Sequence, residues 1–235
     1  MGEIKTIFWD LDHTLWDFER NSGEALQETL YGLDLVGRNG LEIDDFIARY
    51  HVINDRMWDE YRRGLIVKED LRARRFDEAL GLYGIKEDGL GERFATMYLD
   101  ICPLKKNLFP GAEHVLEELS KKYLQYIITN GFSEVQAIKM DNDGLKPYIC
   151  RTITSEEAGA RKPSPIIFEY ALKTVGGDPA SSMMIGDDLD NDIIAALDAG
   201  FARGVWFNPT GKKRDITDDR IIEIHSLIEI LDIIS

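Results

Sequence analysis

The sequence predicts an α/β fold: a Rossmann-like parallel sheet with helices on both faces, plus an all-α helical cap inserted after the first strand. From Leu104 onward, short apolar runs alternate with amphipathic segments, which is typical of a parallel sheet. A buried strand is expected over 4–10, and the interval that follows it shows helical periodicity throughout. We therefore expect an α/β core at 1–15 and 109–235 and a helical cap at 16–108.

Each predicted element has a local reason in the sequence. The first strand is a nearly continuous apolar run that includes Ile7, Phe8 and Trp9, as in a strand buried on both faces. In the inserted segment, apolar residues recur at helical spacing and predict helices at 22–36, 44–63, 68–80 and 87–101. Beyond it, the pattern predicts helices at 111–122, 133–143, 164–175 and 191–199, and strands at 123–129, 150–155, 181–186 and 203–207.

Two helix starts carry the pattern of a capping box, in which a serine is followed three residues later by a glutamate or glutamine. Ser133 and Gln136 form one such pair, at the start of the helix predicted from 133. Ser226 and Glu229 form the other, and they predict a terminal helix.

The chain is acidic, with a formal net charge of −15 over 235 residues. Such a charge argues against nucleic acid or an anionic membrane surface as a partner. A small anionic substrate stays compatible with it, provided that a local cation offsets the field.

The two cysteines, Cys102 and Cys150, are too few for a disulfide framework, and we expect both to pack in the core. With no apolar run of bilayer length and no cationic leader, a cytoplasmic protein is expected, either a monomer or a homodimer.

Asp10 and Asp12 pose an electrostatic problem at the end of the first strand. In an extended chain they point to the same side, while Leu11 between them points back into the core. Two like charges at the edge of a core repel each other and lose hydration. Either a shared proton or a bound cation must compensate.

Polar side chains also follow the other predicted strands. Thr129, Asn130 and Gly131 follow one strand, Lys162 comes after the next, and an acidic run at 187–192 follows the strand after that. Because ligands bind outside the carboxyl ends of parallel strands, we expect these groups to converge on one edge of the sheet.

Each of these motifs has a simpler interpretation when it stands alone. An Asp-x-Asp pair is commonly a turn or a helix N-cap, and the Asn130-Gly131 pair is a strong turn signal. Lys162 could be an ordinary solvated lysine, and the acidic run could be a helix N-terminus satisfied by the helix dipole. Their order along one chain favours a catalytic interpretation.

Four motifs in order resemble those of the haloacid dehalogenase-like phosphohydrolase superfamily. They are Asp10-Leu-Asp12-His-Thr14, Thr129-Asn130-Gly131, Lys162-Pro163 and the acidic run that begins Gly186-Asp187. The predicted cap falls where the helical cap of that superfamily does, closest to its pyrimidine 5′-nucleotidase subgroup. The resemblance implies hydrolysis of a phosphate monoester, a small-molecule substrate.

The resemblance also assigns roles to the acidic residues. It implies that Asp10 attacks phosphorus and forms an aspartyl phosphate, while Asp12 protonates the leaving oxygen and then activates water. Mg²⁺, a hard cation with oxygen ligands, suits Asp10, the carbonyl of Asp12, and Asp187. Asp192 would orient metal-bound waters, and Asp188 is the other acidic candidate near the metal.

The remaining motif residues would handle the phosphoryl group. Thr129 and the backbone N–H groups of Asn130 and Gly131 would hold its oxygens, and Lys162 would offset negative charge.

Residues of the predicted cap suggest the substrate. The segment 58–66 and the Arg75-Phe76 pair are similar to the cap of bacterial nucleotidases that prefer pyrimidine 5′-monophosphates. Trp58 and Tyr61 lie three residues apart on one helical face, and Trp16 and Phe18 lie on the segment that leaves the predicted site; these aromatic rings could stack on a nucleobase.

Alternative functions remain open at this level. The same core could serve a phosphatase of small sugar or glycolate phosphates, or a phosphosugar mutase. A phospho-accepting signalling domain also clusters aspartates, a threonine and a lysine around Mg²⁺, but it has little use for a long helical insertion after its first strand.

Overall fold

The computed structural model describes residues 3–234, which form two compact units. One unit comprises the described residues up to Phe18 and from Lys106 onward, and the other is Glu19–Lys105. Within the described residues, no helix is both long enough and apolar enough to cross a membrane.

The first unit is built on a parallel six-stranded sheet, which confirms the predicted fold class. The strand order is β3-β2-β1-β4-β5-β6. The strands are β1 Thr6–Trp9, β2 Leu124–Thr129, β3 Arg151–Thr154, β4 Ser182–Gly186, β5 Arg203–Phe207 and β6 Ile221–Ile224. Trp9 at the end of β1 pairs in register with Ile127 of β2 and Ile185 of β4. The residues that follow these three strands therefore meet at the centre of one sheet edge.

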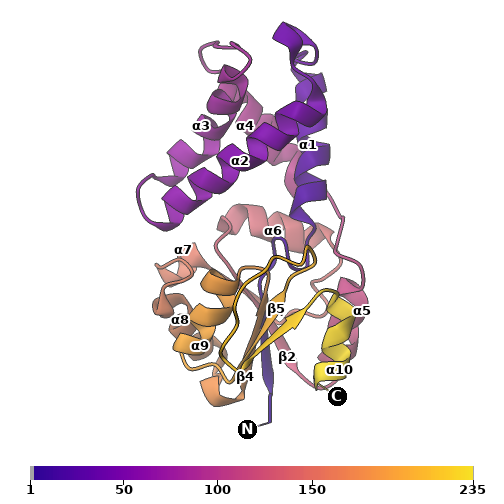
Figure 1. Cartoon of the computed structure of the whole chain (residues 1–235), viewed down its shortest axis with the longest axis vertical. Helices are drawn as coiled ribbons and strands as arrows, with labels where there is room; N and C mark the ends of the chain where they lie inside the picture. The colour runs from indigo at the N-terminus through magenta and orange to yellow at the C-terminus, as the bar shows by residue number, and fades with distance from the viewer. Residues whose placement is uncertain (1–2, 235) are drawn as a thin grey trace. The chain divides into compact units, whose positions relative to one another are not determined.

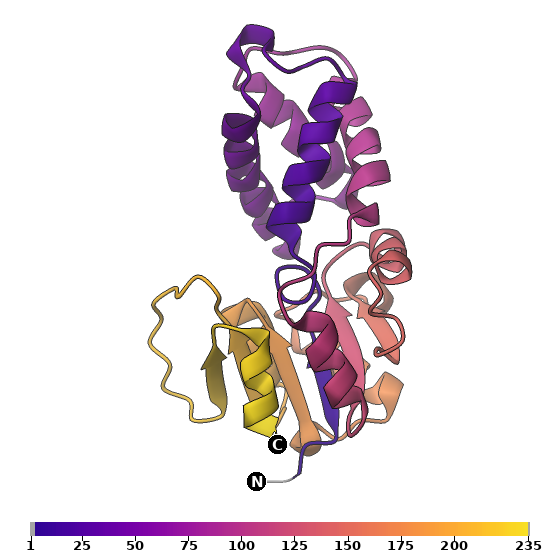
Figure 2. The same ribbon diagram turned by 90° about the vertical axis from the view of Figure 1, so that its right-hand side faces the viewer.

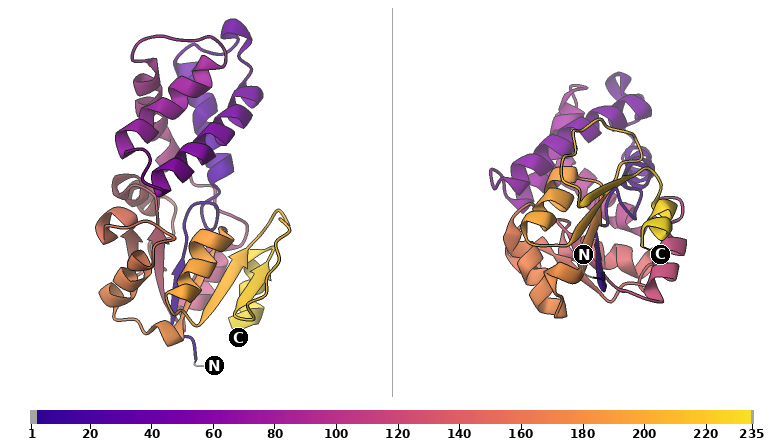
Figure 3. Two further views of the ribbon diagram at one scale, coloured as in Figure 1. Left: turned by 60° about the vertical axis from the view of Figure 1, so that its left-hand side comes forward. Right: turned by 60° about the horizontal axis from the view of Figure 1, so that its bottom comes forward.

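Helices cover both faces of this sheet, as Figures 1 and 3 show. The helices of the unit are α5 Ala112–Ser120, α6 Ser133–Asn142, α7 Ser155–Ala158, α8 Pro165–Val175, α9 Ala195–Asp198 and α10 Ile230–Ile234. On one face α8 and α9 pack over a core that includes Phe8, Ile128 and Met184. On the other face α5 packs against β2 and α10. Burial on both faces explains why β1 is apolar at nearly every position.

The second unit is all-helical. It contains α1 Phe18–Gly32, α2 Ile43–Arg62, α3 Lys68–Gly81 and α4 Leu90–Ile101. Its core is aromatic: the rings of Tyr50 and Phe76 stack with centroids 5.1 Å apart, and those of Phe76 and Phe94 stack at 4.8 Å. The first of these helices begins at Phe18, four residues before the predicted start at 22. Phe18, which was expected on the segment between the sheet and the helices, is therefore the first residue of α1.

Three local predictions were wrong. The helix expected at 191–199 is a π-helix, Leu189–Ile194, followed by the short α9. No strand was predicted at β6, an edge strand of four residues that follows a long connection instead of a helix (Figure 2). Cys150 is exposed because it precedes β3, whereas Cys102 is buried as predicted.

The two predicted capping boxes have opposite outcomes. Ser226 and Glu229 form a capping box with both hydrogen bonds, as expected. At the start of α6 the N-cap is Phe132, whose side chain makes no capping hydrogen bond, and Glu156 Oε2 accepts a hydrogen bond from Ser133 N at 2.8 Å. The Ser133 hydroxyl instead pairs with that of Thr154, and Gln136 turns toward the sheet edge, where the tertiary contacts of its amide replace a local cap.

Candidate active site

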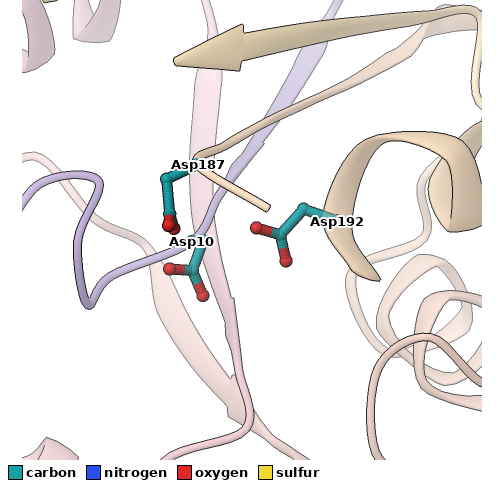
Figure 4. Close-up of side chains that lie close together, drawn as sticks. All are labelled: Asp10, Asp187 and Asp192. Atoms are coloured by element: carbon teal, nitrogen blue, oxygen red, sulfur yellow. The ribbon is translucent and has the colours of Figure 1, made fainter. Parts of the chain in front are cut away.

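Three aspartates gather at the carboxyl edge of the sheet (Figure 4). Asp10 follows β1, Asp187 follows β4, and Asp192 lies in the π-helix after β4. One carboxylate oxygen from each lies within 4.8 Å of the others. Asp10 and Asp192 are almost fully buried, with 7% and 2% of their surface exposed. Adjacent parallel strands that end at the same level bring Asp10 and Asp187 together.

Asp192 reaches this cluster because residue 186 is a glycine. A Cβ atom on Gly186 would lie 2.3 Å from Asp192 Oδ2 and 2.7 Å from Asp192 Cβ. The neighbouring Asp188 caps the π-helix instead, since its Oδ1 accepts hydrogen bonds from the backbone N–H groups of Asp190 and Asn191, at 3.1 and 3.0 Å. The structure therefore brings Asp192, and not Asp188, to the other two carboxylates.

Lys162 is the cation of this cluster. Its Nζ lies 2.5 Å from Asp10 Oδ1 and 2.6 Å from Asp192 Oδ1, and it donates a hydrogen bond to the Ile128 carbonyl at 3.0 Å. Only 3% of the residue is exposed, so the solvated-lysine interpretation does not describe it. Asn130 holds the backbone of Lys162 in place, because its side chain accepts from Lys162 N at 2.8 Å and donates to Lys162 O at 3.0 Å.

Burial and mutual repulsion dominate the electrostatics of the cluster. Burial raises the pKa of Asp10 well above its ordinary value; Lys162 opposes this shift, while Asp192 and Asp187 add to it. Burial and the charges of Asp192 and Asp188 raise the pKa of Asp187 to about 8. For Lys162, burial lowers the pKa but Asp10 and Asp192 more than reverse that effect, so the ammonium stays charged. One ammonium facing three carboxylates leaves an excess of negative charge that a divalent cation would neutralise.

Asp12 lies apart from these carboxylates, against α6. Gln136 Nε2 donates to Asp12 Oδ2 at 2.8 Å, and Lys139 forms a short contact with Asp12 Oδ1. Burial alone would raise the pKa of Asp12, but the charge and hydrogen bond of Lys139 and the hydrogen bond of Gln136 outweigh it, so the pKa lies below its ordinary value. The carboxylate is thus held ionised and separate from the three clustered aspartates.

The hydroxyl of Thr129 connects the phosphate-binding motif to α6. It accepts hydrogen bonds from Gly131 N and from Gln136 Nε2, both at 3.0 Å. A second hydroxyl, that of Thr14, donates to Asp187 Oδ1 at 3.3 Å. Gln136 and Lys139 were not predicted from the sequence as site residues. Their spacing of three on one helix was the available signal, and the capping-box pattern obscured it.

The four aromatic residues predicted to contact substrate fall into two pairs. In the segment that leaves the sheet, Trp16 is fully buried and the Lys139 ammonium lies 3.9 Å from its ring centroid. The Phe18 ring lies 6.1 Å from that of Trp16. In the helical unit, Trp58 meets Tyr61 edge to face at 5.7 Å, and Tyr61 is 3% exposed.

Known proteins resemble this chain over most of its sheet and over the inserted helices. The family model described as haloacid dehalogenase-like hydrolase matches residues 4–200. Pyrimidine 5′-nucleotidase YjjG of Escherichia coli strain K12 is 32% identical over 204 residues, which are 86% of this chain and 85% of that protein. Pyrimidine 5′-nucleotidase PynA of Streptococcus pneumoniae is 27% identical over 231 residues, which are 97% of this chain and 94% of that protein.

The fold has a counterpart among solved structures. The putative HAD-hydrolase YfnB of Bacillus subtilis, crystallised with magnesium, superposes with a TM-score of 0.88 at 27% sequence identity, and 99% of each chain is covered. Both the sheet and the inserted helices of this chain therefore have equivalents in that hydrolase.

Proposed function

This chain belongs to the haloacid dehalogenase-like hydrolase family, and from that premise we propose that it is a Mg²⁺-dependent phosphomonoesterase that hydrolyses pyrimidine nucleoside 5′-monophosphates through an aspartyl phosphate. The single observation that carries the proposal is the buried Asp10–Lys162 pair, set beside Asp187 and Asp192 at the sheet edge.

Asp10 is the proposed nucleophile. Its carboxylate lies at the end of the central strand and contacts the Lys162 ammonium, which lowers the repulsion between a carboxylate and an incoming phosphate dianion. A bond forms between an Asp10 oxygen and phosphorus while the ester bond to the leaving oxygen breaks. Asp12 is ionised in the free protein and would take up a proton from water when substrate binds, because the negative charge of the nearby phosphate favours the neutral carboxyl group. It would give this proton to the leaving oxygen and would later remove a proton from the water that hydrolyses the aspartyl phosphate.

The phosphoryl oxygens would be held at the end of β2. The Thr129 hydroxyl already accepts from Gln136 and Gly131, so its own hydrogen would be donated to the substrate. Backbone N–H groups of Asn130 and Gly131 would add further donors, as the turn between β2 and α6 presents the main chain at the site.

The residues present suit Mg²⁺. Asp10, Asp187 and the carbonyl of Asp12 would hold it and Asp192 would orient its waters, an all-oxygen donor set of the kind that hard divalent cations take. When bound, the ion would neutralise the negative charge of the carboxylates and of the phosphoryl group.

The nucleotide preference rests on the two curated relatives and on the helical unit. Both relatives are named for pyrimidine 5′-nucleotidase activity, and both cover most of this chain. Trp58, which meets the buried Tyr61 edge to face, would contact the base of the leaving group.

Phosphate release from a panel of monoesters tests the proposal. Uridine and thymidine monophosphates should be cleaved far better than sugar and glycolate phosphates, with activity lost to a chelator and restored by Mg²⁺. Asp10→Asn should retain the fold and lose nearly all turnover, while the exposed Asp100→Asn serves as the matched control. Equal or better cleavage of sugar phosphates would make the protein a phosphatase of small sugar phosphates. Turnover by Asp10→Asn, or turnover without metal, would refute the mechanism.

A further inference from the structure

We propose that Lys139 and Gln136 are positioning residues that together fix the Asp12 carboxylate for its exchange of protons with the leaving group and with water. The inference rests on the proposed function, because it concerns the acid–base role of Asp12. We call the two side chains the α6 clamp.

The clamp comes from one face of one helix. Gln136 and Lys139 lie three residues apart on α6, a spacing that places both side chains on the same side. Each takes one oxygen of Asp12: Gln136 Nε2 donates to Oδ2 at 2.8 Å, and Lys139 Nζ contacts Oδ1. Two donors on two oxygens fix both the position and the plane of the carboxylate.

Both members of the clamp are nearly inaccessible to solvent. Gln136 is 1% exposed and Lys139 is 3% exposed, whereas the Asp12 side chain keeps 24% of its surface exposed. The clamp therefore holds Asp12 from the protein side and leaves part of it open. Because each carboxylate oxygen has two acceptor sites, the open part can still meet a substrate oxygen or a water.

A buried ammonium needs a specific environment, and Lys139 has one. Asp12 neutralises its charge, and the ring of the fully buried Trp16 lies 3.9 Å from Nζ as a cation–π partner. A buried ion pair contributes little net stability compared with an apolar replacement, since desolvation offsets the attraction. Orientation of Asp12 accounts for the pair better than stability does.

The clamp also explains the glycine of the Thr129-Asn130-Gly131 motif. A Cβ atom on Gly131 would lie 1.7 Å from Gln136 Nε2, so any side chain there would displace the amide. That same Nε2 lies 3.0 Å from Thr129 Oγ1. One amide group thus ties the acid–base carboxylate to the phosphate-binding hydroxyl, and their separation is set by α6.

Without the clamp, the Asp12 side chain would be free to redistribute among its staggered rotamers. Misplacement of a catalytic group by about 1 Å can lower a rate by about 100-fold. The loss should fall on the step that needs Asp12, which is protonation of a poor leaving group. Binding of the phosphoryl group should change little, since Asp10, Lys162 and Asp187 are untouched.

The first experiment compares Lys139→Met with Lys139→Arg in steady-state hydrolysis of uridine 5′-monophosphate and p-nitrophenyl phosphate. Lys139→Met should lower kcat for the nucleotide by about 10- to 100-fold with KM little changed, and should affect p-nitrophenyl phosphate much less, since nitrophenolate leaves without protonation. Lys139→Arg keeps a donor and should recover most of the nucleotide activity. Lys146→Met removes a lysine whose side chain is 71% exposed and should match the unaltered protein.

A double-mutant cycle then asks whether Lys139 acts through Asp12. In an Asp12→Asn background, Lys139→Met should produce no further loss of kcat on uridine 5′-monophosphate, because the carboxylate that it positions is already gone. The same fold-loss in both backgrounds would overturn the inference, as would equal losses on both substrates or failure of Lys139→Arg to recover activity.

Failure of the inference can be told apart from failure of the proposed function. An unaltered protein that releases no phosphate from uridine 5′-monophosphate or p-nitrophenyl phosphate would overturn the proposed function, and the clamp with it. An active protein in which Lys139→Met is equally active would overturn the clamp alone.

Discussion

Adding Mg²⁺ to the metal-free protein should raise its melting temperature, because Asp10, Asp187 and Asp192 repel one another in a buried site. At the 4.8 Å limit of their separation, ionising two of these carboxylates together costs about 3.5 kcal/mol with an effective dielectric constant near 20. This repulsion adds to burial in raising the pKa values of Asp10 and Asp187. The Lys162 ammonium offsets part of this repulsion, and a bound divalent cation would offset the rest. Free Mg²⁺ at about 100 times its dissociation constant stabilises the folded state by about 2.7 kcal/mol.

For a chain of 235 residues, each kcal/mol corresponds to roughly 2–4 °C in melting temperature, so the expected shift is about 5–11 °C. Scanning calorimetry with chelator and with excess Mg²⁺ measures it.

Asp187→Asn is the informative variant: the amide can keep the contact with Thr14 while one repelling charge is removed. It should melt no lower than the unaltered protein in chelator, and should lose most of the Mg²⁺ shift. Asp100→Asn, an exposed control, should keep the shift in full. The same Mg²⁺ shift in Asp187→Asn and the unaltered protein would refute the placement of the metal.

Three further predictions concern the reaction. Asp12→Asn should lower kcat for nucleotides by about 10²–10⁴-fold and for p-nitrophenyl phosphate much less, and equal losses in steady-state assays would remove its acid–base role. Trp58→Ala should raise KM for uridine 5′-monophosphate by roughly 5- to 150-fold, the equivalent of about 1–3 kcal/mol of base stacking, with p-nitrophenyl phosphate unaffected; if the variant instead melts lower and loses both activities alike, Trp58 is a packing residue. Gly131→Ala should lower nucleotide turnover with little change in melting temperature, because the added Cβ displaces the flexible end of Gln136; normal turnover would show that Gln136 does not hold Asp12.

Most of the fold could be predicted because the spacing of apolar residues along the chain shows which side of each helix or strand is buried. The strand at 203–207 matches β5, and the helix predicted at 133–143 differs from α6 by one residue at its end. The convergence of Asp10 with Asp187 follows from parallel strands whose ends share one edge. The edge strand β6 could not be found in this way, because only Ile224 among its four residues is buried and the segment lacks a buried-strand pattern.

The missed part of the site depends on contacts that local sequence does not encode. Gln136 fits a capping box three residues after Ser133, yet its amide bonds to Asp12, which is 124 positions away in the chain. Asp188 and Asp192 are equally acidic in the sequence, and only the π-helical turn and Gly186 decide which one joins the cluster. Such long-range choices are made by tertiary packing.

The most direct test of the central claim is to trap the covalent intermediate on Asp10. Quenching the protein during turnover of uridine 5′-monophosphate with tritiated borohydride would reduce an aspartyl phosphate to homoserine, and peptide mapping would locate the label. We predict labelled homoserine at position 10, dependent on substrate and Mg²⁺ and absent from Asp10→Asn. Steady phosphate release with no label at position 10, or with the label on another aspartate, would contradict the account.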